Sequence, residues 1–207
     1  MILGVIPARL NSTRFPSKVI FPLKGKPIIE HVYEKALQSN LLNKVIVAVD
    51  SEETKNVINC QNIIMTSDKH QSGTDRVAEV ANNFNCDIVV NIQGDEPGID
   101  PLLIDKLIQL FEDPDVEMAS IASTDLKEDD LNNDNVVKVN LDKENNAISF
   151  IRNNLNPEST YYRHIGIYAY RKNTLNLFTS LTQSDNEKNH RLEQLRALDN
   201  NIAIKLL

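Results

Sequence analysis

Residues 1–18, MILGVIPARLNSTRFPSK, join an apolar run to a loop rich in cations and hydroxyl groups. The apolar start predicts a buried first strand, and Pro7 is expected to end it because proline cannot donate to a strand ladder. The chain would then leave the sheet where α/β folds bind ligands, beyond the carboxyl ends of parallel strands. Arg9, Arg14 and Lys18 suit a polyphosphate there. A solvated basic loop is the alternative, and the glycine-rich Walker A pattern is absent.

Short apolar runs alternate with longer amphipathic stretches, which predicts β-strands connected by helices. Strand–helix–strand repeats pair in parallel with right-handed crossovers, and both faces of such a sheet are covered. The expected fold class is α/β, a doubly wound, mostly parallel sheet. Helix starts are predicted at Pro27, at Asp50 or Ser51, and at Pro101. The predicted strands span residues 2–6, 45–49, 63–65, 88–92, 118–122, 136–141, 147–151, 165–170 and 202–207.

Composition limits the classes of protein that this chain can be. Its 207 residues, 41% of them hydrophobic, are enough for one large core, so a single domain over residues 1–207 is expected. A formal net charge of −7 argues against a non-specific nucleic-acid binder. Cys60 and Cys86 lack metal-ligand spacing. No apolar run approaches the roughly 18 residues of a membrane span and no leader pattern precedes the first strand, so a cytoplasmic protein is expected.

The alternation of strands and helices changes at about residue 124, where a polar, acidic segment is followed by two strand candidates in quick succession. Strands without an intervening helix tend to pair antiparallel. Residues 124–171 are therefore predicted to form a small antiparallel flap. The acidic run itself is interpreted as a solvated surface loop.

Residues 91–97, NIQGDEP, place Gln93, Asp95 and Glu96 directly after a predicted strand. Hard carboxylate oxygens suit Mg²⁺ when phosphate and water supply its other ligands. Gly-Asp and Glu-Pro are equally common in plain turns. The position beside the first loop favours the metal site.

Residues 70–76, HQSGTDR, lead into an amphipathic helix. Ser72, Gly73 and Thr74 have small side chains, and the backbone of a glycine can approach a ligand closely. Thr74 is equally suited to cap the helix, so this stretch alone is weak evidence for a ligand site.

Residues 163–171, RHIGIYAYR, alternate so that His164, Tyr168 and Tyr170 share one face of a strand. Such a face can floor a polar sugar pocket, although plain packing is the more common use of it. Residues 190–198, HRLEQLRAL, have the spacing of an amphipathic helix with a polar outer face.

Together these stretches closely resemble the 3-deoxy-manno-octulosonate cytidylyltransferases, a family of sugar nucleotidyltransferases. The resemblance covers nearly the whole chain, and the combination is more specific than any single motif. It implies transfer of CMP from CTP to the acidic sugar Kdo, with release of pyrophosphate, use of Mg²⁺ and a place in lipopolysaccharide biosynthesis. The matching stretches are PARLNSTRFPSK (7–18), HQSGTDR (70–76), NIQGDEP (91–97), RHIGIYAYR (163–171) and LEQLRAL (192–198).

The resemblance also implies a role for each matching residue. The implied catalytic residues are Arg9, Arg14, Lys18 and Asp95, with Asp95 as the metal ligand. The implied nucleotide-binding positions are Pro7, Ala8, Arg9, Lys18, Ser72, Gly73, Thr74, Arg76 and Gln93. The implied sugar-binding positions are Arg14, Gln93, Arg152, His164, Tyr168, Glu193 and Gln194.

The sequence departs from the family pattern in three places. Ser17 stands where the family usually has Gly, and residues 153–157 replace an Ile-Pro-containing segment. The chain ends at Leu207, before a Gly-(Val/Ile)-Asp-Thr-type segment whose Asp is a second metal ligand in the family. A truncated or impaired form is therefore one expectation. An enzyme for another acidic sugar, either sialic acid or an amino-substituted Kdo, is the other alternative.

The resemblance further implies a homodimer bridged by residues 124–157. A two-fold interface is self-complementary, so apolar side chains in this segment are expected to be shared between subunits. The candidates are Ile148, Phe150 and Ile151.

Overall fold

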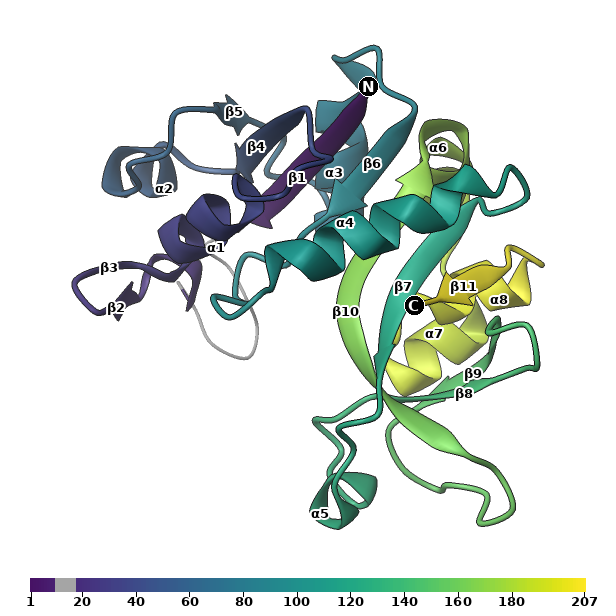
Figure 1. Cartoon of the computed structure of the whole chain (residues 1–207). Helices are drawn as coiled ribbons and strands as arrows, with labels where there is room; N and C mark the ends of the chain where they lie inside the picture. Colours follow the sequence, from purple (N-terminus) through teal and green to yellow (C-terminus); the bar gives the residue numbers. More distant parts are fainter. Residues whose placement is uncertain (10–17) are drawn as a thin grey trace. The chain divides into compact units, whose positions relative to one another are not determined.

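The computed structural model describes residues 1–9 and 18–207 (Figure 1). The chain divides into two compact units, Met1–Ile108 and Gln109–Leu207. The predicted flap, residues 124–171, lies inside the second unit. Arg14, which the resemblance assigns to both substrates, lies outside the described residues. Within residues 1–9 and 18–207, no helix combines the length and the apolar character that crossing a membrane requires.

The first unit is built on four parallel strands in the order β6-β1-β4-β5. The interior positions of β1 and β4 are almost completely buried, as expected for strands covered on both faces. The strands are β1 (Ile2–Ala8), β4 (Lys44–Val49), β5 (Ile63–Met65) and β6 (Ile88–Asn91). A 3₁₀ turn η1 (Lys18–Ile20) and a short hairpin, β2 (Pro22–Leu23) with β3 (Lys26–Pro27), precede the first helix.

The helices of the first unit cover both faces of this sheet. α1 joins β1 to β4, whereas α3 lies on the connection that returns from β5 across the sheet to β6. Right-handed crossovers that run in opposite directions place their helices on opposite faces (Figure 1). The doubly wound, mostly parallel fold predicted from the sequence is confirmed. The helices are α1 (Ile28–Ala36), α2 (Glu52–Val57), α3 (Gly73–Asn82) and α4 (Pro101–Gln109).

The prediction that Pro7 ends the first strand is wrong. β1 continues to Ala8, and Pro7 lies opposite Ala48 of β4. The carbonyl of Val5 accepts from Ile92 on the β6 side, and alternation places the backbone of Pro7 on the same side. β6 ends at Asn91, opposite Val5, so the missing N–H of Pro7 points past the end of β6 and no ladder bond is lost.

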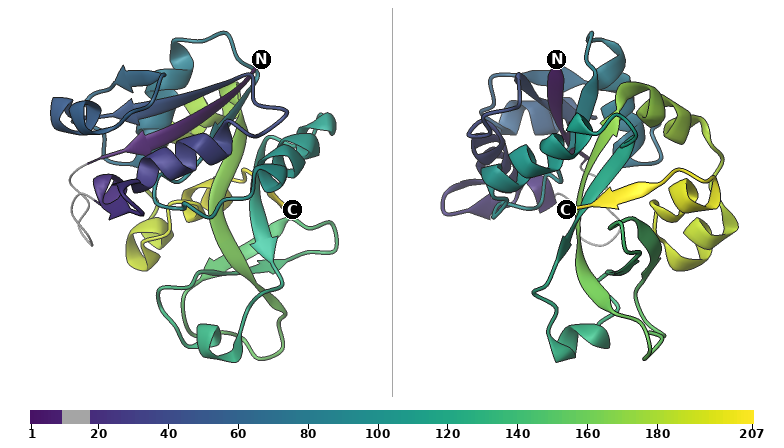
Figure 2. Two further views of the ribbon diagram at one scale, coloured as in Figure 1. Left: turned by 60° about the vertical axis from the view of Figure 1, so that its left-hand side comes forward. Right: turned by 45° about the vertical axis from the view of Figure 1, so that its right-hand side comes forward.

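The second unit is dominated by antiparallel pairing. Its long strand β10 pairs with β8 through its first residues and with β7 through the rest, and Figure 2 shows this strand as a bent green ribbon. β8 and β9 pair antiparallel, which confirms the prediction for strands in quick succession, and β11 pairs parallel with β7. The strands are β7 (Met118–Ser123), β8 (Lys138–Leu141), β9 (Ala147–Ile151), β10 (Tyr161–Arg171) and β11 (Ile204–Leu206).

Short helices complete the second unit. The acidic segment contains one helical turn without a buried residue, in line with a solvated surface. The helical elements are η2 (Leu110–Glu112), α5 (Glu128–Leu131), α6 (Lys172–Ser180), α7 (Asp185–His190) and α8 (Leu195–Asp199).

Residues 190–198 do not form the single helix that their spacing suggests. α7 ends at His190, and Arg191 follows in the left-handed conformation, with φ of 54°. A left-handed residue closes a helix at its carboxyl end. Glu193 and Gln194 therefore lie on a turn between α7 and α8.

Candidate functional site

The three motifs of the first unit meet at one edge of its sheet. Gly73 begins α3 against the Pro7 ring, because a Cβ added to Gly73 would lie 3.4 Å from Pro7 Cγ. A Cβ on Gly94, in the turn after β6, would lie 3.1 Å from the carbonyl oxygen of Pro7. The absence of a side chain at Gly94 therefore lets the turn that carries Asp95 approach the end of β1.

This edge is also where the sheet changes direction. β1 and β6 are neighbours, and the chain leaves β1 toward β4 but reaches β6 from the opposite direction. Ligands of open α/β sheets bind beyond the carboxyl ends of the strands at such a switch point. Gln93 and Asp95 follow β6 here, and Arg9 follows β1.

Lys18 and Asp95 form an ion pair at this edge, with Lys18 Nζ 2.7 Å from Asp95 Oδ2. Their side chains remain 45% and 37% exposed, so solvent reaches both partners. An ion pair of this exposure is worth about 1 kcal/mol or less. Exchange of either partner for a ligand group therefore costs little.

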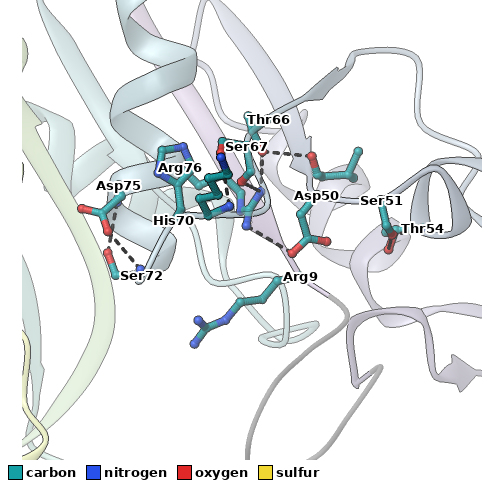
Figure 3. A network of polar contacts seen from close by, with 12 residues as sticks. Arg9, Asp50, Ser51, Thr54, Thr66, Ser67, His70, Ser72, Asp75 and Arg76 are labelled. Atoms are coloured by element: carbon teal, nitrogen blue, oxygen red, sulfur yellow. Dashed lines mark hydrogen bonds and ion pairs between the residues drawn. The ribbon is translucent and has the colours of Figure 1, made fainter.

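The amino-terminal end of α3 carries a complete capping box. The backbone N–H of Asp75 donates to Ser72 Oγ at 3.1 Å, and the N–H of Ser72 donates to Asp75 Oδ2 at 3.0 Å (Figure 3). Ser72 is the helix cap, so Thr74, the candidate cap in the sequence, instead lies buried within the first turn. Arg9 Nη1 donates to the carbonyl of Gln71 at 3.3 Å, which brings a cation to this helix end.

Arg76 is directed into the protein rather than toward solvent, with only 1% of the residue exposed. Its guanidinium donates to Asp50 Oδ2 at 3.2 Å, to the Ser67 carbonyl at 3.2 Å and to the hydroxyl of Thr66 (Figure 3). Burial lowers the pKa of Arg76, the charge of Asp50 opposes this change, and the charge of Arg9 adds to it. Arg76 thus connects α3 to the ends of β4 and β5, and its contacts hold the edge together.

Asp95 is not part of a cluster of described residues that could hold a divalent metal by itself, so a metal at this carboxylate would need further ligands. Among residues 1–9 and 18–207, His, Cys, Asp and Glu side chains form no cluster of three or more at metal-binding spacing. One carboxylate with phosphate oxygens and water is the arrangement that Mg²⁺ commonly adopts. In the structure the carboxylate of Asp95 pairs with the ammonium of Lys18.

The second unit brings together several of the predicted sugar-binding residues. The rings of His164 and Tyr168 lie 5.5 Å apart, those of Tyr168 and Tyr170 lie 6.1 Å apart, and Phe150 contacts His164 edge-on at 4.9 Å. The predicted shared face of His164, Tyr168 and Tyr170 is confirmed by these contacts. Burial, and secondly the charge of Glu193, raise the pKa of Tyr168, which places Glu193 near this face.

The turn that carries Glu193 and Gln194 is held by a buried ion pair. Arg196 donates to Glu187 through Nε at 2.8 Å and through Nη2 at 2.6 Å, and each of these residues is 4% exposed. Arg196 also lies 3.7 Å from Glu193 Oε1. Such a two-pronged contact fixes geometry as well as adding energy. The polar positions of LEQLRAL therefore anchor the turn from inside.

Arg152 lies beside a buried lysine that the sequence analysis did not single out. Lys138 is 0% exposed and donates to the carbonyls of Asn133 and Val136, each at 3.0 Å, and to the carbonyl of Arg152. Arg152 Nη1 itself donates to the carbonyl of Asp134 at 2.8 Å. A lysine within a run of valines gives no local signal of this role, because the carbonyls it joins come from separate segments.

The comparisons with known proteins agree over the full chain. A sequence model of the family described as cytidylyltransferase matches residues 3–204. The 3-deoxy-manno-octulosonate cytidylyltransferase of Pelobacter propionicus is 39% identical and that of Chloroherpeton thalassium is 42% identical. The alignments cover 100% and 97% of this chain and 88% and 86% of those proteins.

Solved structures agree with the sequence relatives. The structure of CMP:2-keto-3-deoxy-manno-octonic acid synthetase complexed with CTP superimposes with a TM-score of 0.93 at 36% identity, covering 100% of this chain and 88% of that one. The 4-diphosphocytidyl-2C-methyl-D-erythritol synthase of Anaerococcus prevotii reaches a TM-score of 0.65 at 12% identity, covering 100% and 87%. At that identity the second match shows the fold alone.

Proposed function

Because the chain belongs to the cytidylyltransferase family, we propose that it transfers CMP from CTP to the anomeric hydroxyl of the acidic sugar Kdo and releases pyrophosphate. The protein is a nucleotidyltransferase. CTP and Kdo are proposed as substrates because the chain is similar over its full length to 3-deoxy-manno-octulosonate cytidylyltransferases. The TM-score of 0.93 to the structure of a CTP complex supports this proposal. The product is an activated acidic sugar of the kind used in lipopolysaccharide biosynthesis.

The proposed reaction is an in-line displacement at the α-phosphorus of CTP. The anomeric oxygen forms a bond to this phosphorus, the bond to the β-phosphate oxygen breaks, and the hydroxyl proton passes to solvent. No covalent intermediate on the protein is needed, so the residues orient the substrates and offset developing charge. Arg9 and Lys18, at the switch-point edge, are proposed to bind the triphosphate and the leaving pyrophosphate.

Mg²⁺ is the proposed cofactor, with Asp95 as the protein ligand. When bound, this ion supplies a Lewis acid that polarises the α-phosphate. Lys18 would then exchange the carboxylate of Asp95 for a phosphate oxygen, which its low-cost ion pair permits. Asp95 would thus bind the cation, and Lys18 the phosphate, at the same edge of the sheet.

The second unit is proposed to bind the acidic sugar. Arg152 offers a planar cation for the sugar carboxylate, which distinguishes an acidic sugar from a neutral one. Tyr168 and Glu193 supply a hydroxyl and a carboxylate on the face described above. The rival substrates, sialic acid and amino-substituted Kdo, share the carboxylate and differ in the groups around the ring.

A substrate panel tests this function. We expect pyrophosphate release with CTP and Kdo, and little release when UTP, ATP or GTP replaces CTP. The same assay with sialic acid and amino-substituted Kdo compares the rival sugars. Faster release with either rival would reassign the sugar, and CTP binding without release under any condition would indicate an inactive nucleotide-binding form.

A homodimer is also proposed, with β9 contributing to the interface. Ile148 on β9 is 58% exposed, whereas Phe150 is only 1% exposed because it packs inside its own subunit against His164. Ile148 is therefore the better candidate for a shared apolar contact. Sedimentation of the parent and of Ile148→Glu at micromolar concentration checks this proposal: a monomeric parent, or a dimer that Ile148→Glu leaves unchanged, argues against it.

A further inference from the structure

Strand β10 contains an irregularity beside His164. Going along the β10–β7 ladder, Ile165 lies opposite Ile121, but the next pair is Tyr168 with Ser120. Gly166 and Ile167 are therefore extra residues on β10 with no partner of their own in this register. Bulges of this kind re-aim nearby side chains and often lie next to functional sites.

The hydroxyl of Ser120 lies within this irregularity. Ser120 is 0% exposed, and its Oγ is 2.8 Å from the carbonyl oxygen of Ile167 and 3.3 Å from that of Ile165. The same Oγ is 2.9 Å from Nε2 of His164. One buried oxygen thus faces two carbonyls and one ring nitrogen.

The number of protons at this point limits the arrangement. A hydroxyl has one proton to donate, and a carbonyl oxygen can only accept. The proton of Ser120 therefore goes to a carbonyl, with Ile167 at the shorter distance. Donation to His164 instead would remove this hydrogen bond from both carbonyls, at a cost of about 1 kcal/mol or more. Nε2 of His164 is consequently the donor, and Ser120 Oγ accepts from it.

The proton on Nε2 determines the state of the other ring nitrogen of His164, Nδ1. Its neighbours Phe150 and Tyr168 make ring contacts, and burial lowers the pKa of His164 to about 3, so the ring is neutral near pH 7. A neutral imidazole has one N–H and one lone pair. With the proton on Nε2, the lone pair is on Nδ1, for which the described residues provide no hydrogen-bond donor.

We infer that Ser120 is a positioning residue that holds His164 in the Nε2–H tautomer, so that Nδ1 accepts a hydrogen bond from a hydroxyl of the acidic sugar. The inference rests on the proposed function for the identity of this ligand. A neutral hydrogen-bond acceptor is unsuited to the sugar carboxylate, so the carboxylate is assigned to the cation of Arg152. A site that hydrogen-bonds a substrate hydroxyl in this way discriminates against an analogue that lacks the hydroxyl.

The tautomer can be measured without any substrate. Nitrogen-15 NMR of the ring nitrogens near pH 7 is expected to show a protonated Nε2 and an unprotonated Nδ1 for His164. The chain has four histidines, so the signal that disappears in His164→Gln identifies the ring. In Ser120→Ala the two nitrogen shifts should move toward each other as the tautomers mix. A parent protein with the proton on Nδ1, or a Ser120→Ala spectrum identical to the parent, would overturn the inference.

Kinetics give the second readout. Ser120→Ala is expected to raise KM for Kdo about tenfold with KM for CTP unchanged, and Ser120→Thr, which keeps the hydroxyl, should restore it. Ser123→Ala is the matched control, because Ser123 lies on the same strand and its Oγ accepts from the N–H of Asp125 at 3.1 Å. Equal changes in KM for Kdo and KM for CTP, or no rescue by threonine, would show that Ser120 has only a structural role.

The two failures can be told apart. If the parent releases no pyrophosphate with Kdo, the proposed function fails while the NMR result still decides the tautomer. If the parent is active and Ser120→Ala leaves KM for Kdo unchanged, the function stands and the inference fails.

Discussion

Asp95→Asn is expected to abolish turnover while the fold and most nucleotide binding are retained. Asparagine keeps the shape of the side chain but removes the negative charge that would hold Mg²⁺ against the α-phosphate. The loss should therefore appear where charge develops, in the transition state, more than in ground-state binding. Removal of one such electrostatic contribution commonly lowers kcat by about a hundredfold to a thousandfold. The fold should survive because the lost ion pair with Lys18 is partly exposed to solvent and so contributes little to stability.

The measurement is pyrophosphate release during a Mg²⁺ titration, with circular dichroism as the test of folding. Asp68→Asn is the matched control: Asp68 is an exposed carboxylate that follows β5 in the same unit. We expect this control to keep the parent's rate and metal dependence. An Asp95→Asn protein as active as its parent would falsify the metal site.

Lys18→Ala is expected to weaken CTP binding or turnover at least tenfold. A charge-assisted hydrogen bond to phosphate is worth about 1.5–3 kcal/mol, and each 1.4 kcal/mol corresponds to a factor of ten. Lys18→Arg should retain part of the activity, because it keeps the charge but not the compact ammonium. Lys106→Ala removes an exposed lysine from α4 and serves as the control for net charge.

The assay compares KM for CTP and kcat in these variants, after circular dichroism has confirmed their folding. A Lys18→Ala protein with the parent's kinetic constants would remove Lys18 from the triphosphate site and leave its ion pair with Asp95 as a surface contact.

The sequence by itself determined the alternation of strands and helices and the edge at which the polar motifs gather. These features are local, because an apolar run long enough for a strand, followed by Gly, Asp or a helix cap, dictates where each element stops. The stretch containing Gln93, Gly94 and Asp95 is an example, since the apolar run before it predicts the strand that it follows. The antiparallel pairing of β8 with β9 was predictable because the two strands follow one another without an intervening helix.

What only the tertiary structure decided depends on partners that are distant in the chain. Pro7 remains within its strand because the neighbouring β6 ends early. The sequence around Pro7 gives no information about where β6 ends. Arg76 is buried because Asp50 and Thr66, on other segments, supply its acceptors. Ser120 meets His164 only through a shift in strand register. Burial and hydrogen-bond partners of polar groups are set by which strands lie side by side, and that is a property of the whole fold rather than of any one stretch.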